Sequence, residues 1–341
     1  RQRLLYPCNW PGVFMSDGSP TPLLANWPRR VQGGLTTRTV ARWARQHFSE
    51  RQGPMLLYTC SLSPVTLGLC QGLKERDDLR VVSRCVGGDV REDQHPSGTI
   101  PFKKAMLREV DWLYPVSEHL CSFLVKQNPE VSTKITVSRN GISETGFQIT
   151  ASVDGVWRIL SCGMMVPVKR YDLLAKGLSI LARRLPAQRI EWRHMLMGAM
   201  DSAVEAVMAD APANLTGHFI TGIRDVRADY RNRHFDLFVH VSHSEGFSLA
   251  VAEALSCGIP VLATDSGGVS DMVDGTVGRL ISNDIDPPQL ADILGKMLSS
   301  PRDLASKKEP AVVRWQEVAD ADLNYAMFAQ SLAGIAETLA Q

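Results

Sequence analysis

The chain has 341 residues, which is long for one hydrophobic core and favours two domains. Its 37 basic and 36 acidic side chains leave a formal net charge of +1, so no overall field favours nucleic acid as a partner. The hydrophobic content of 44% is that of a globular protein, no apolar run is long enough to span a bilayer, and the first residues do not predict a secretion signal.

Short apolar runs alternate with helical patterns in the first part of the chain. We expect strands at Arg3–Cys8, Met55–Thr59, Arg80–Cys85, Trp112–Val116 and Ile135–Val137, and helices at Leu35–Phe48, Pro64–Lys74, Phe102–Val110 and Glu118–Gln127. This alternation predicts a parallel sheet with helices on both faces. Gly33 and Gly34, directly before the first helix, would let the backbone approach a phosphate or sugar, or would only form a turn.

The same alternation continues after a boundary near Phe147. We expect strands at Trp157–Ser161, Glu191–Met197, Phe219–Gly222, Phe235–Val241, Pro260–Thr264 and Thr276–Ile281, and helices at Tyr171–Leu185, Phe247–Ser256, Pro288–Leu298 and Asp322–Leu339. The sequence therefore predicts an α/β protein with domains at residues 1–148 and 149–321, followed by a last helix in residues 322–341.

The segment from His240 to Val273 carries the most information. The run Phe235–Val241 is typical of a strand buried on both faces, so the loop that follows it lies at a strand's carboxyl end, where catalytic loops of such sheets sit. The N–H groups of Phe247, Ser248 and Leu249 would be unpaired donors at a helix start. A pyrophosphate at this position gains from both the hydrogen bonds and the helix dipole.

Two glutamates flank this helix start. Glu245 precedes the helix, and Glu253 lies about two turns inside it. A carboxylate accepts two hydroxyls at once, so each glutamate suits a vicinal diol of ribose or of a sugar. Either one alone would be interpreted as a solvated surface residue.

Another candidate anion contact is the pair Lys169 and Arg170, at the start of the helix after the Trp157 strand. A helix start disfavours cations unless an anion is bound, which favours a phosphate contact over a solvated pair. Asp89, after Gly87 and Gly88, is a candidate catalytic residue or simply a turn residue.

The stretch EGFSLAVAE, followed by ALSCGIPVLATDSGG, resembles the E-x7-E segment of retaining family 4 glycosyltransferases, which belong to the glycosyl transferases group 1. The resemblance is closest over residues 235–280 and looser over most of the chain. It implies the GT-B fold: two doubly wound, Rossmann-like domains that face each other across a cleft, with a C-terminal helix that crosses back to the first domain.

The resemblance also implies roles for individual residues. Glu245 would contact the transferred sugar and Glu253 the ribose, with Gly246 between the strand and the helix. Lys169 stands in the family's diphosphate-binding lysine slot, after Gly163, whereas Met164 replaces the usual arginine and Arg170 would substitute for it. Loops at Gly198, Thr221 and Gly222 would enclose the nucleobase. Val86 replaces a histidine of the reaction centre, so Asp89 or another group would supply that contact.

From this resemblance we expect metal-independent transfer of a sugar, with retention, from a UDP- or GDP-sugar to a hydroxyl acceptor. The acceptor would be a sugar, a lipid-linked molecule or a small molecule, in polysaccharide, lipopolysaccharide or glycoconjugate biosynthesis. Two alternatives stay open because of Met164 and Val86: a non-catalytic sugar-nucleotide-binding subunit and a same-fold epimerase. A glycoside hydrolase is disfavoured by the spacing of the two glutamates, about 12 Å along a helix. A dehydrogenase is disfavoured because no strand is followed by G-x-G-x-x-G.

The sequence predicts neither a cofactor nor a metal site. Seven cysteines are odd in number and never in C-x-x-C spacing, namely Cys8, Cys60, Cys70, Cys85, Cys121, Cys162 and Cys257. This is typical of reduced thiols in a cytoplasmic protein, and peripheral contact with the cytoplasmic face of a membrane stays open. We interpret the Asp-x-Asp patterns at Asp284 and Asp320 as a turn and a helix cap.

Overall fold

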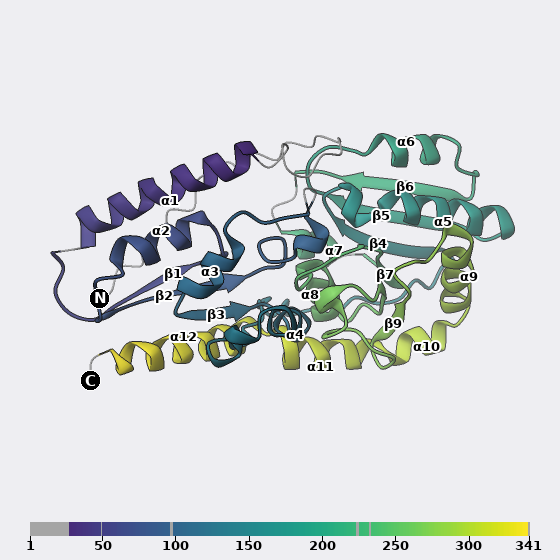
Figure 1. Cartoon of the computed structure of the whole chain (residues 1–341). Helices are drawn as coiled ribbons and strands as arrows, with labels where there is room; N and C mark the ends of the chain where they lie inside the picture. Colours follow the sequence, from purple (N-terminus) through teal and green to yellow (C-terminus); the bar gives the residue numbers. More distant parts are fainter. Residues whose placement is uncertain (1–26, 49, 96–97, 223–224, 232, 340–341) are drawn as a thin grey trace.

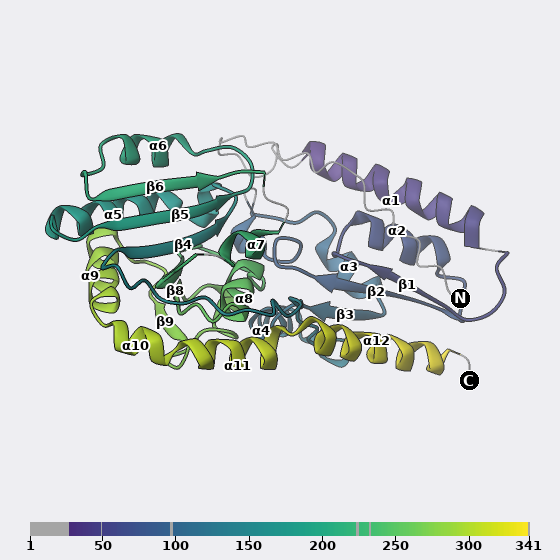
Figure 2. The same ribbon diagram turned by 180° about the vertical axis from the view of Figure 1, so that it is seen from behind.

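The computed structural model describes residues 27–48, 50–95, 98–222, 225–231 and 233–339. The strand expected at Arg3–Cys8 lies outside the described residues. Figure 1 and Figure 2 show two α/β halves side by side, each with its own sheet, and a long C-terminal helix that runs from the second half back along the first.

The first half holds a three-stranded parallel sheet in the order β1-β2-β3. Its strands are β1 (Met55–Thr59), β2 (Leu79–Cys85) and β3 (Trp112–Pro115), and its helices are α1 (Trp27–Phe48), α2 (Pro64–Leu73), α3 (Lys103–Glu109) and α4 (Glu118–Gln127), with short 3₁₀ turns at Glu92–Gln94 (η1) and Pro129–Thr133 (η2). The expected strand at Ile135–Val137 is reduced to a single bridge between Ile135 and Leu113. The predicted cap of α4 is confirmed, since the Ser117 side chain accepts the N–H of Leu120.

The second half holds a six-stranded parallel sheet in the order β6-β5-β4-β7-β8-β9. Its strands are β4 (Trp157–Gly163), β5 (Ile190–Leu196), β6 (Leu215–Ile220), β7 (Leu237–His240), β8 (Val261–Thr264) and β9 (Gly278–Ile281). Its helical elements are η3 (Pro167–Lys169), α5 (Tyr171–Arg184), α6 (Ser202–Ala209), α7 (Val226–Tyr230), α8 (Leu249–Ser256), η4 (Gly267–Val269), α9 (Pro287–Leu298), α10 (Pro301–Ser306) and α11 (Lys308–Ala319). Numbered within this sheet the order is 3-2-1-4-5-6, the doubly wound Rossmann order, with its switch point between β4 and β7.

Alternating side chains of these strands build two apolar layers. On one face of the sheet, Ile159, Trp192 and Val239 pack with α5 and α9. On the other face, Leu160 and Phe238 pack with α8. Successive side chains of a strand point to opposite faces of the sheet, so both faces are covered by helices and buried. The unbroken apolar runs in the sequence predict this arrangement.

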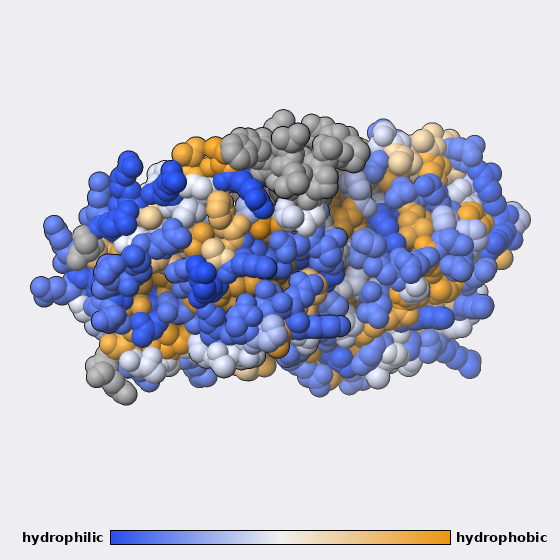
Figure 3. All heavy atoms as spheres, in the orientation of Figure 1, coloured by the Kyte–Doolittle hydropathy of each residue, from blue (hydrophilic) through white to orange (hydrophobic). Residues whose placement is uncertain are grey.

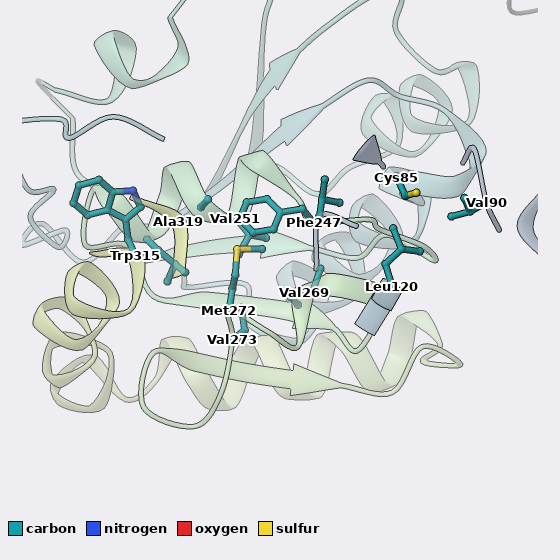
Figure 4. Close-up of a cluster of buried hydrophobic side chains, with 14 of the residues drawn as sticks. Cys85, Val90, Leu120, Phe247, Val251, Val269, Met272, Val273, Trp315 and Ala319 are labelled. Carbon is teal, nitrogen blue, oxygen red and sulfur yellow. The ribbon is translucent and has the colours of Figure 1, made fainter. Parts of the chain in front are cut away.

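The cluster on the α8 side continues into the first half. Phe247 and Val269 of the second half belong to the same buried cluster as Cys85, Val90 and Leu120 of the first. Figure 4 shows these side chains in one close-up, together with Trp315 of α11. The two halves thus pack against each other through one continuous cluster of buried apolar side chains.

The last helix, α12 (Ala321–Thr338), closes the first half. Phe328 packs edge-on against Tyr58 and Tyr114, and the Tyr114 hydroxyl lies 2.8 Å from the Ser331 hydroxyl. The expected crossing of the C-terminal helix onto the first domain is therefore confirmed. The Asp320 side chain caps α12 by accepting the N–H groups of Asp322 and Leu323, which also confirms the interpretation of that aspartate as a helix cap.

The other Asp-x-Asp pattern also has a local role. Asp286 caps α9 by accepting the N–H of Gln289 in a capping box, directly after the turn that holds Asp284. The six described cysteines are free thiols, and four of them are buried. Among the described residues, no helix is both long and apolar enough to cross a bilayer.

Candidate active site

Two loops meet at the switch point of the second sheet. The loop after β4 carries Lys169 at the end of η3, and the loop after β7 carries Glu245. In open doubly wound sheets, ligands bind outside the carboxyl ends of the strands at this point. The topology therefore brings together two of the residues singled out from the sequence, although they lie 76 positions apart.

Lys169 and Glu245 form a short ion pair, with the Lys169 ammonium donating to Oε1 of the carboxylate. The Glu245 side chain is only 9% exposed and that of Lys169 is 22% exposed. A contact between opposite charges in such a protected place is stronger than one on the open surface. The predicted diphosphate-binding lysine is thus held by the predicted sugar-binding carboxylate.

The same carboxylate oxygen has a second partner. His240, at the end of β7, places Nε2 2.7 Å from Oε1 of Glu245. Burial by itself would raise the pKa of Glu245, but His240 and Lys169 outweigh it and lower that pKa to about 2. Glu245 is therefore an ionised hydrogen-bond acceptor over the whole physiological pH range.

The first turn of α8 leaves its N–H groups open. The sequence predicted a helix from Phe247, whereas α8 begins at Leu249 because Ser248 adopts a left-handed conformation, with φ 67° and ψ 86°. The backbone N–H groups of Phe247, Ser248 and Leu249 form no hydrogen bond with any residue that the structure describes. The predicted set of unpaired donors is thus present, although Phe247 and Ser248 precede the helix.

Glu253 is the fifth residue of α8, so it lies just over one turn inside the helix and not two. Its side chain has no hydrogen bond or ion pair with any other described residue. Burial raises the pKa of Glu253 to about 7, while Arg227 lowers it and Asp225 raises it by smaller amounts. A half-buried carboxylate without a partner is costly unless a ligand supplies hydrogen bonds.

The loop between Glu245 and α8 touches the first half directly. A Cβ atom built on Gly246 would lie 2.0 Å from the carbonyl oxygen of Val86, so only glycine fits there. On the same side, a Cβ atom on Gly268 would lie 2.7 Å from Cβ of Ser117, and the Gly268 N–H donates to the carbonyl oxygen of Glu245. Backbone of both halves therefore meets beside Glu245, with the Val86 side chain exposed next to it.

Arg170 does not lie where the sequence analysis expected a substitute for the missing arginine. Its guanidinium donates to the carbonyl oxygens of Val241 and Asn283 and to Oδ1 of Asn283, at 2.6–2.8 Å. These three bonds fasten the loop after β4 to neighbouring segments, and burial lowers the pKa of Arg170. Arg170 is thus engaged by groups of the protein itself, and its contact with the donor stays a prediction, while Met164 in the same loop is 45% exposed.

Asp89 likewise has a local role. Its two carboxylate oxygens accept the backbone N–H groups of Leu62, Val86 and Gly87, each at 2.9 Å. Burial raises the pKa of Asp89, and these three hydrogen bonds partly offset that rise. The structure thus gives Asp89 the contacts of a turn residue beside Gly246, and its catalytic role stays a prediction.

Gly33 and Gly34 are also placed differently. Both lie inside α1, which begins at Trp27, so they do not form a turn before a helix. A Cβ atom on Gly33 would lie 3.2 Å from the Phe102 ring, which shows that the glycine packs against a side chain of the first half. The expected turn at this glycine pair is therefore wrong, and its approach to a phosphate or sugar stays a prediction.

The remaining predicted residues follow strands of the second sheet. Gly163 ends β4 with φ 150°, and a Cβ atom there would lie 2.7 Å from the Tyr171 hydroxyl. Gly198 follows β5, and Thr221 and Gly222 follow β6, all three exposed. These residues share the carboxyl edge of the sheet with Lys169 and Glu245. The contacts of Gly198, Thr221 and Gly222 to a nucleobase, and the place of Gly163 in the donor site, stay predictions.

The sequence analysis missed His240. Its side chain is 1% exposed, and it is the polar residue that ends the apolar strand β7. A histidine inside a run that is otherwise apolar was the available signal, because a buried imidazole needs a hydrogen-bond partner. Here that partner is Glu245.

Two other observations bear on where a ligand binds. A cavity of about 390 Å³ lies away from these loops, between Arg158, Arg193 and Arg233, but these arginines are already ion-paired with Asp154 and Asp229. Across the described residues, no group of three His, Cys, Asp or Glu side chains has the arrangement of a metal site. The switch point carries the unpaired donors and the unpartnered carboxylate, so we assign the candidate site there.

Parts of the chain are similar in sequence to known proteins. The sequence model of the glycosyl transferases group 1 family matches residues 157–300. An MMP alpha-(1→4)-mannosyltransferase of Mycolicibacterium hassiacum is 25% identical over 241 residues, which cover 65% of this chain and 55% of the relative. A D-inositol 3-phosphate glycosyltransferase of Gordonia bronchialis is 31% identical over 189 residues, covering 50% of this chain and 40% of the relative. The chain thus spans about half the length of these curated relatives.

Solved structures share the fold. The sucrose-phosphate synthase of Thermosynechococcus elongatus superposes with a TM-score of 0.69 at 15% identity, covering 90% of this chain and 79% of that one. The Anabaena protein HepE, solved in complex with UDP, superposes with a TM-score of 0.67 at 16% identity, covering 87% and 82%. At such identities the likeness shows the GT-B fold with its two Rossmann-like domains.

Proposed function

We propose that this chain, which has the GT-B fold and matches the glycosyl transferases group 1 model over residues 157–300, transfers a sugar from a UDP- or GDP-sugar to a hydroxyl acceptor. One observation carries the proposal: the ion-paired Lys169 and Glu245 meet at the switch point, a few residues from the open N–H groups at the start of α8. A cation, a carboxylate and free amides in one place suit a ligand that has both phosphates and hydroxyls.

Each group has a role in this reaction. The N–H groups of Phe247, Ser248 and Leu249 and the ammonium of Lys169 stabilise the negative charge that develops on the leaving diphosphate. Glu253 accepts the ribose hydroxyls, which provides the partners that its carboxylate lacks in the free protein. Glu245 accepts hydroxyls of the transferred sugar. Breakage of the bond between sugar and phosphate is thus favoured by groups already in place.

The proposal includes retention of the anomeric configuration and independence from a divalent metal. Charge neutralisation by Lys169 and the backbone amides is the function that a metal would otherwise serve. We expect activity to be unchanged by EDTA and the product to keep the anomeric configuration of the donor, as read by proton NMR of the new linkage. A loss of activity that Mg²⁺ or Mn²⁺ restores would contradict the first part, and an inverted product the second.

The test of function uses a panel of UDP- and GDP-sugars. We expect at least one nucleotide to raise the melting temperature of the protein, and the matching sugar donor to be hydrolysed slowly and to be consumed faster with an acceptor. Glu253→Ala should lose nucleotide affinity ten- to a hundredfold, as expected for about 1.5 to 3 kcal/mol from a hydrogen bond to a charged group. Unchanged affinity in this variant would contradict the ribose assignment.

A second candidate is a sugar-nucleotide-binding subunit without catalysis. It is favoured by Met164 and Val86, two exposed apolar side chains at positions where the family resemblance implies an arginine and a histidine. Thermal stabilisation by a nucleotide without turnover of any donor, across several acceptors, would support this candidate. An epimerase would instead convert the donor's sugar without an acceptor.

We propose a cytoplasmic role in polysaccharide, lipopolysaccharide or glycoconjugate biosynthesis, with α1 as the surface for peripheral membrane contact. This 22-residue helix has five arginines and no acidic residue, and it exposes Leu35 and Trp43. Figure 3 shows hydrophilic spheres along most of α1 and a hydrophobic area near its start. Such a helix suits an anionic bilayer surface. Sedimentation with phosphatidylglycerol vesicles but not with phosphatidylcholine vesicles would support this contact, and equal recovery with both would oppose it.

A further inference from the structure

His240 is a buried titratable group that the proposed reaction does not use. Its Nε2 lies 2.7 Å from Oε1 of Glu245 and 3.3 Å from Oγ of Ser248. Its Nδ1 is buried and has no hydrogen-bond partner among the described residues. An imidazole that forms hydrogen bonds through only one of its nitrogens is costly to bury. We therefore look for a function of the contact between His240 and Glu245 that offsets this cost.

Lys169 has two competing partners in the proposed reaction. It donates to Oε1 of Glu245 in the free protein, and the donor's diphosphate requires the same ammonium. Within the loop from Gly163 to Arg170, no other cation can replace it, because Arg170 is held by Val241 and Asn283. Donor binding therefore draws Lys169 away from Glu245.

After that exchange, Glu245 would be a nearly buried carboxylate that has lost a counter-charge. Such a group either takes up a proton or turns toward another donor. His240 already lies within hydrogen-bond distance of the same oxygen, so it can hold the carboxylate in place without any movement. The second oxygen then remains available for a sugar hydroxyl.

Ser248 provides an independent observation. It adopts a left-handed conformation that glycine would tolerate with less strain, and its side chain is nearly buried. Its hydroxyl lies against His240 Nε2. Strained backbone held by its surroundings is concentrated at functional sites, and here the strained residue touches the imidazole that touches Glu245.

We infer that His240 is a positioning residue for Glu245, supported by Ser248, and that it keeps the carboxylate oriented toward the donor sugar when Lys169 passes to the diphosphate. This inference rests on the proposed function. It assigns to His240 no contact with substrate, so its effect should appear in how the sugar is bound and turned over, not in how the nucleotide is bound.

The test compares His240→Leu with His240→Gln. Leucine fills the buried space without a donor, whereas the glutamine amide can place an N–H near the position of Nε2. We expect His240→Leu to lower kcat about ten- to a hundredfold while affinity for the nucleoside diphosphate changes less than threefold, and His240→Gln to restore most of kcat. Ser248→Gly should raise the melting temperature and lower kcat by a few fold.

A second measurement does not need turnover. We expect His240→Leu to weaken binding of the intact nucleotide-sugar at least threefold more than binding of the nucleoside diphosphate, by isothermal titration calorimetry. Equal losses for both ligands, or a kcat of His240→Leu at the wild-type level, would overturn the inference. A wild-type protein that binds donors but never turns them over would contradict the proposed transfer instead, and the affinity comparison would still decide the role of His240.

Discussion

Two carboxylates, one in each half of the molecule, differ in how the fold satisfies them. In the first half, Asp89 accepts three backbone N–H groups, from Leu62, Val86 and Gly87. At the switch point of the second half, the Glu253 side chain has no partner among the described residues, and the three N–H groups of Phe247, Ser248 and Leu249 at the start of α8 are open. Polar groups that the fold leaves unsatisfied indicate where a ligand binds, and saturated ones indicate where the fold is held together.

The largest expected effect tests this contrast within one loop. Lys169→Met should lower kcat/KM for the donor by about 10²- to 10³-fold, because an ammonium about 4 Å from a phosphate contributes roughly 4 kcal/mol at an effective dielectric near 20, less its desolvation. Arg170→Met is the matched control. It should lower the melting temperature and leave nucleotide affinity within threefold. If Arg170→Met lost affinity as Lys169→Met does, Arg170 would be a donor ligand after all.

Asp89→Asn tests the first half. The asparagine would keep one acceptor but place an amide next to backbone N–H groups, so we expect the free energy of unfolding to fall by about 1 to 3 kcal/mol in urea titrations. Nucleotide affinity of the folded variant should be unchanged. A folded variant of normal stability without turnover would restore the catalytic assignment of Asp89.

The pH dependence of binding sharpens the assignment of Glu253. Burial raises its pKa from 4.5 to about 7, so the carboxyl is mostly protonated at pH 6 and mostly ionised at pH 8. Nucleotide affinity should therefore rise by several fold across this interval in the wild type. The nucleotide's own phosphates titrate in the same way when it binds to Glu253→Gln. The difference between the pH dependences of affinity of the two proteins therefore reports on Glu253 alone. Parallel curves would contradict the assignment.

The same shift has a consequence for stability. A pKa that is raised in the folded state means that Glu253 stabilises the fold fully below about pH 4.5 and that this contribution is lost as pH rises through 7. Between pH 5 and 8, the free energy of unfolding should thus decrease less for Glu253→Gln than for the wild type.

Met164→Arg should produce a smaller gain. The Met164 side chain is 45% exposed in the loop that carries Lys169, so an arginine there can reach a bound diphosphate without displacing buried groups. We expect donor affinity to rise about three- to tenfold, as for a partly solvated charged contact. Titration of wild type and variant with the donor at two salt concentrations checks this prediction. The gain in donor affinity should be smaller at the higher salt concentration.

The smallest effect concerns Gly34. A Cβ atom added to Gly34 would have its nearest neighbouring atom at 3.7 Å, which is an ordinary van der Waals contact. The residue also lies inside α1. Gly34→Ala should therefore stabilise the chain by about 0.5 to 1 kcal/mol and leave nucleotide affinity unchanged. A loss of affinity would return this glycine to the donor site.

The central strands β4, β7 and β8 were predictable from sequence because they are mostly apolar and buried on both faces, whereas the edge strand β6, with exposed polar residues, was expected at Phe219–Gly222 and spans Leu215–Ile220. Lys169 and Glu245 were found for the same reason, since both follow such strands. The ring of His240 was missed because strand patterns carry no information on hydrogen bonds between neighbouring loops. The contacts of Arg170 were not predictable because its partners, Val241 and Asn283, are distant in sequence and become neighbours only through the strand order.

The first half was less predictable at its loops. Gly33 and Gly34 suggested a turn, but Phe102 packs against Gly33 and the helix continues through both glycines. Tertiary packing overrode a local preference that favours helix ends for glycine. The beginning of the chain, including the strand expected at Arg3–Cys8, lies outside the described residues.

The contact between Gly246 and Val86 is made by main-chain atoms, a carbonyl oxygen against a Cα. The separation of the two halves at this point is thus insensitive to which side chain stands at position 86. Evolution or an engineer can exchange Val86 for a larger or polar residue and reshape what an incoming acceptor meets, while the geometry on the nucleotide side stays as it is. Position 246 does not tolerate such exchanges, since a single added methyl group would clash with the carbonyl oxygen of Val86 and push the two halves apart.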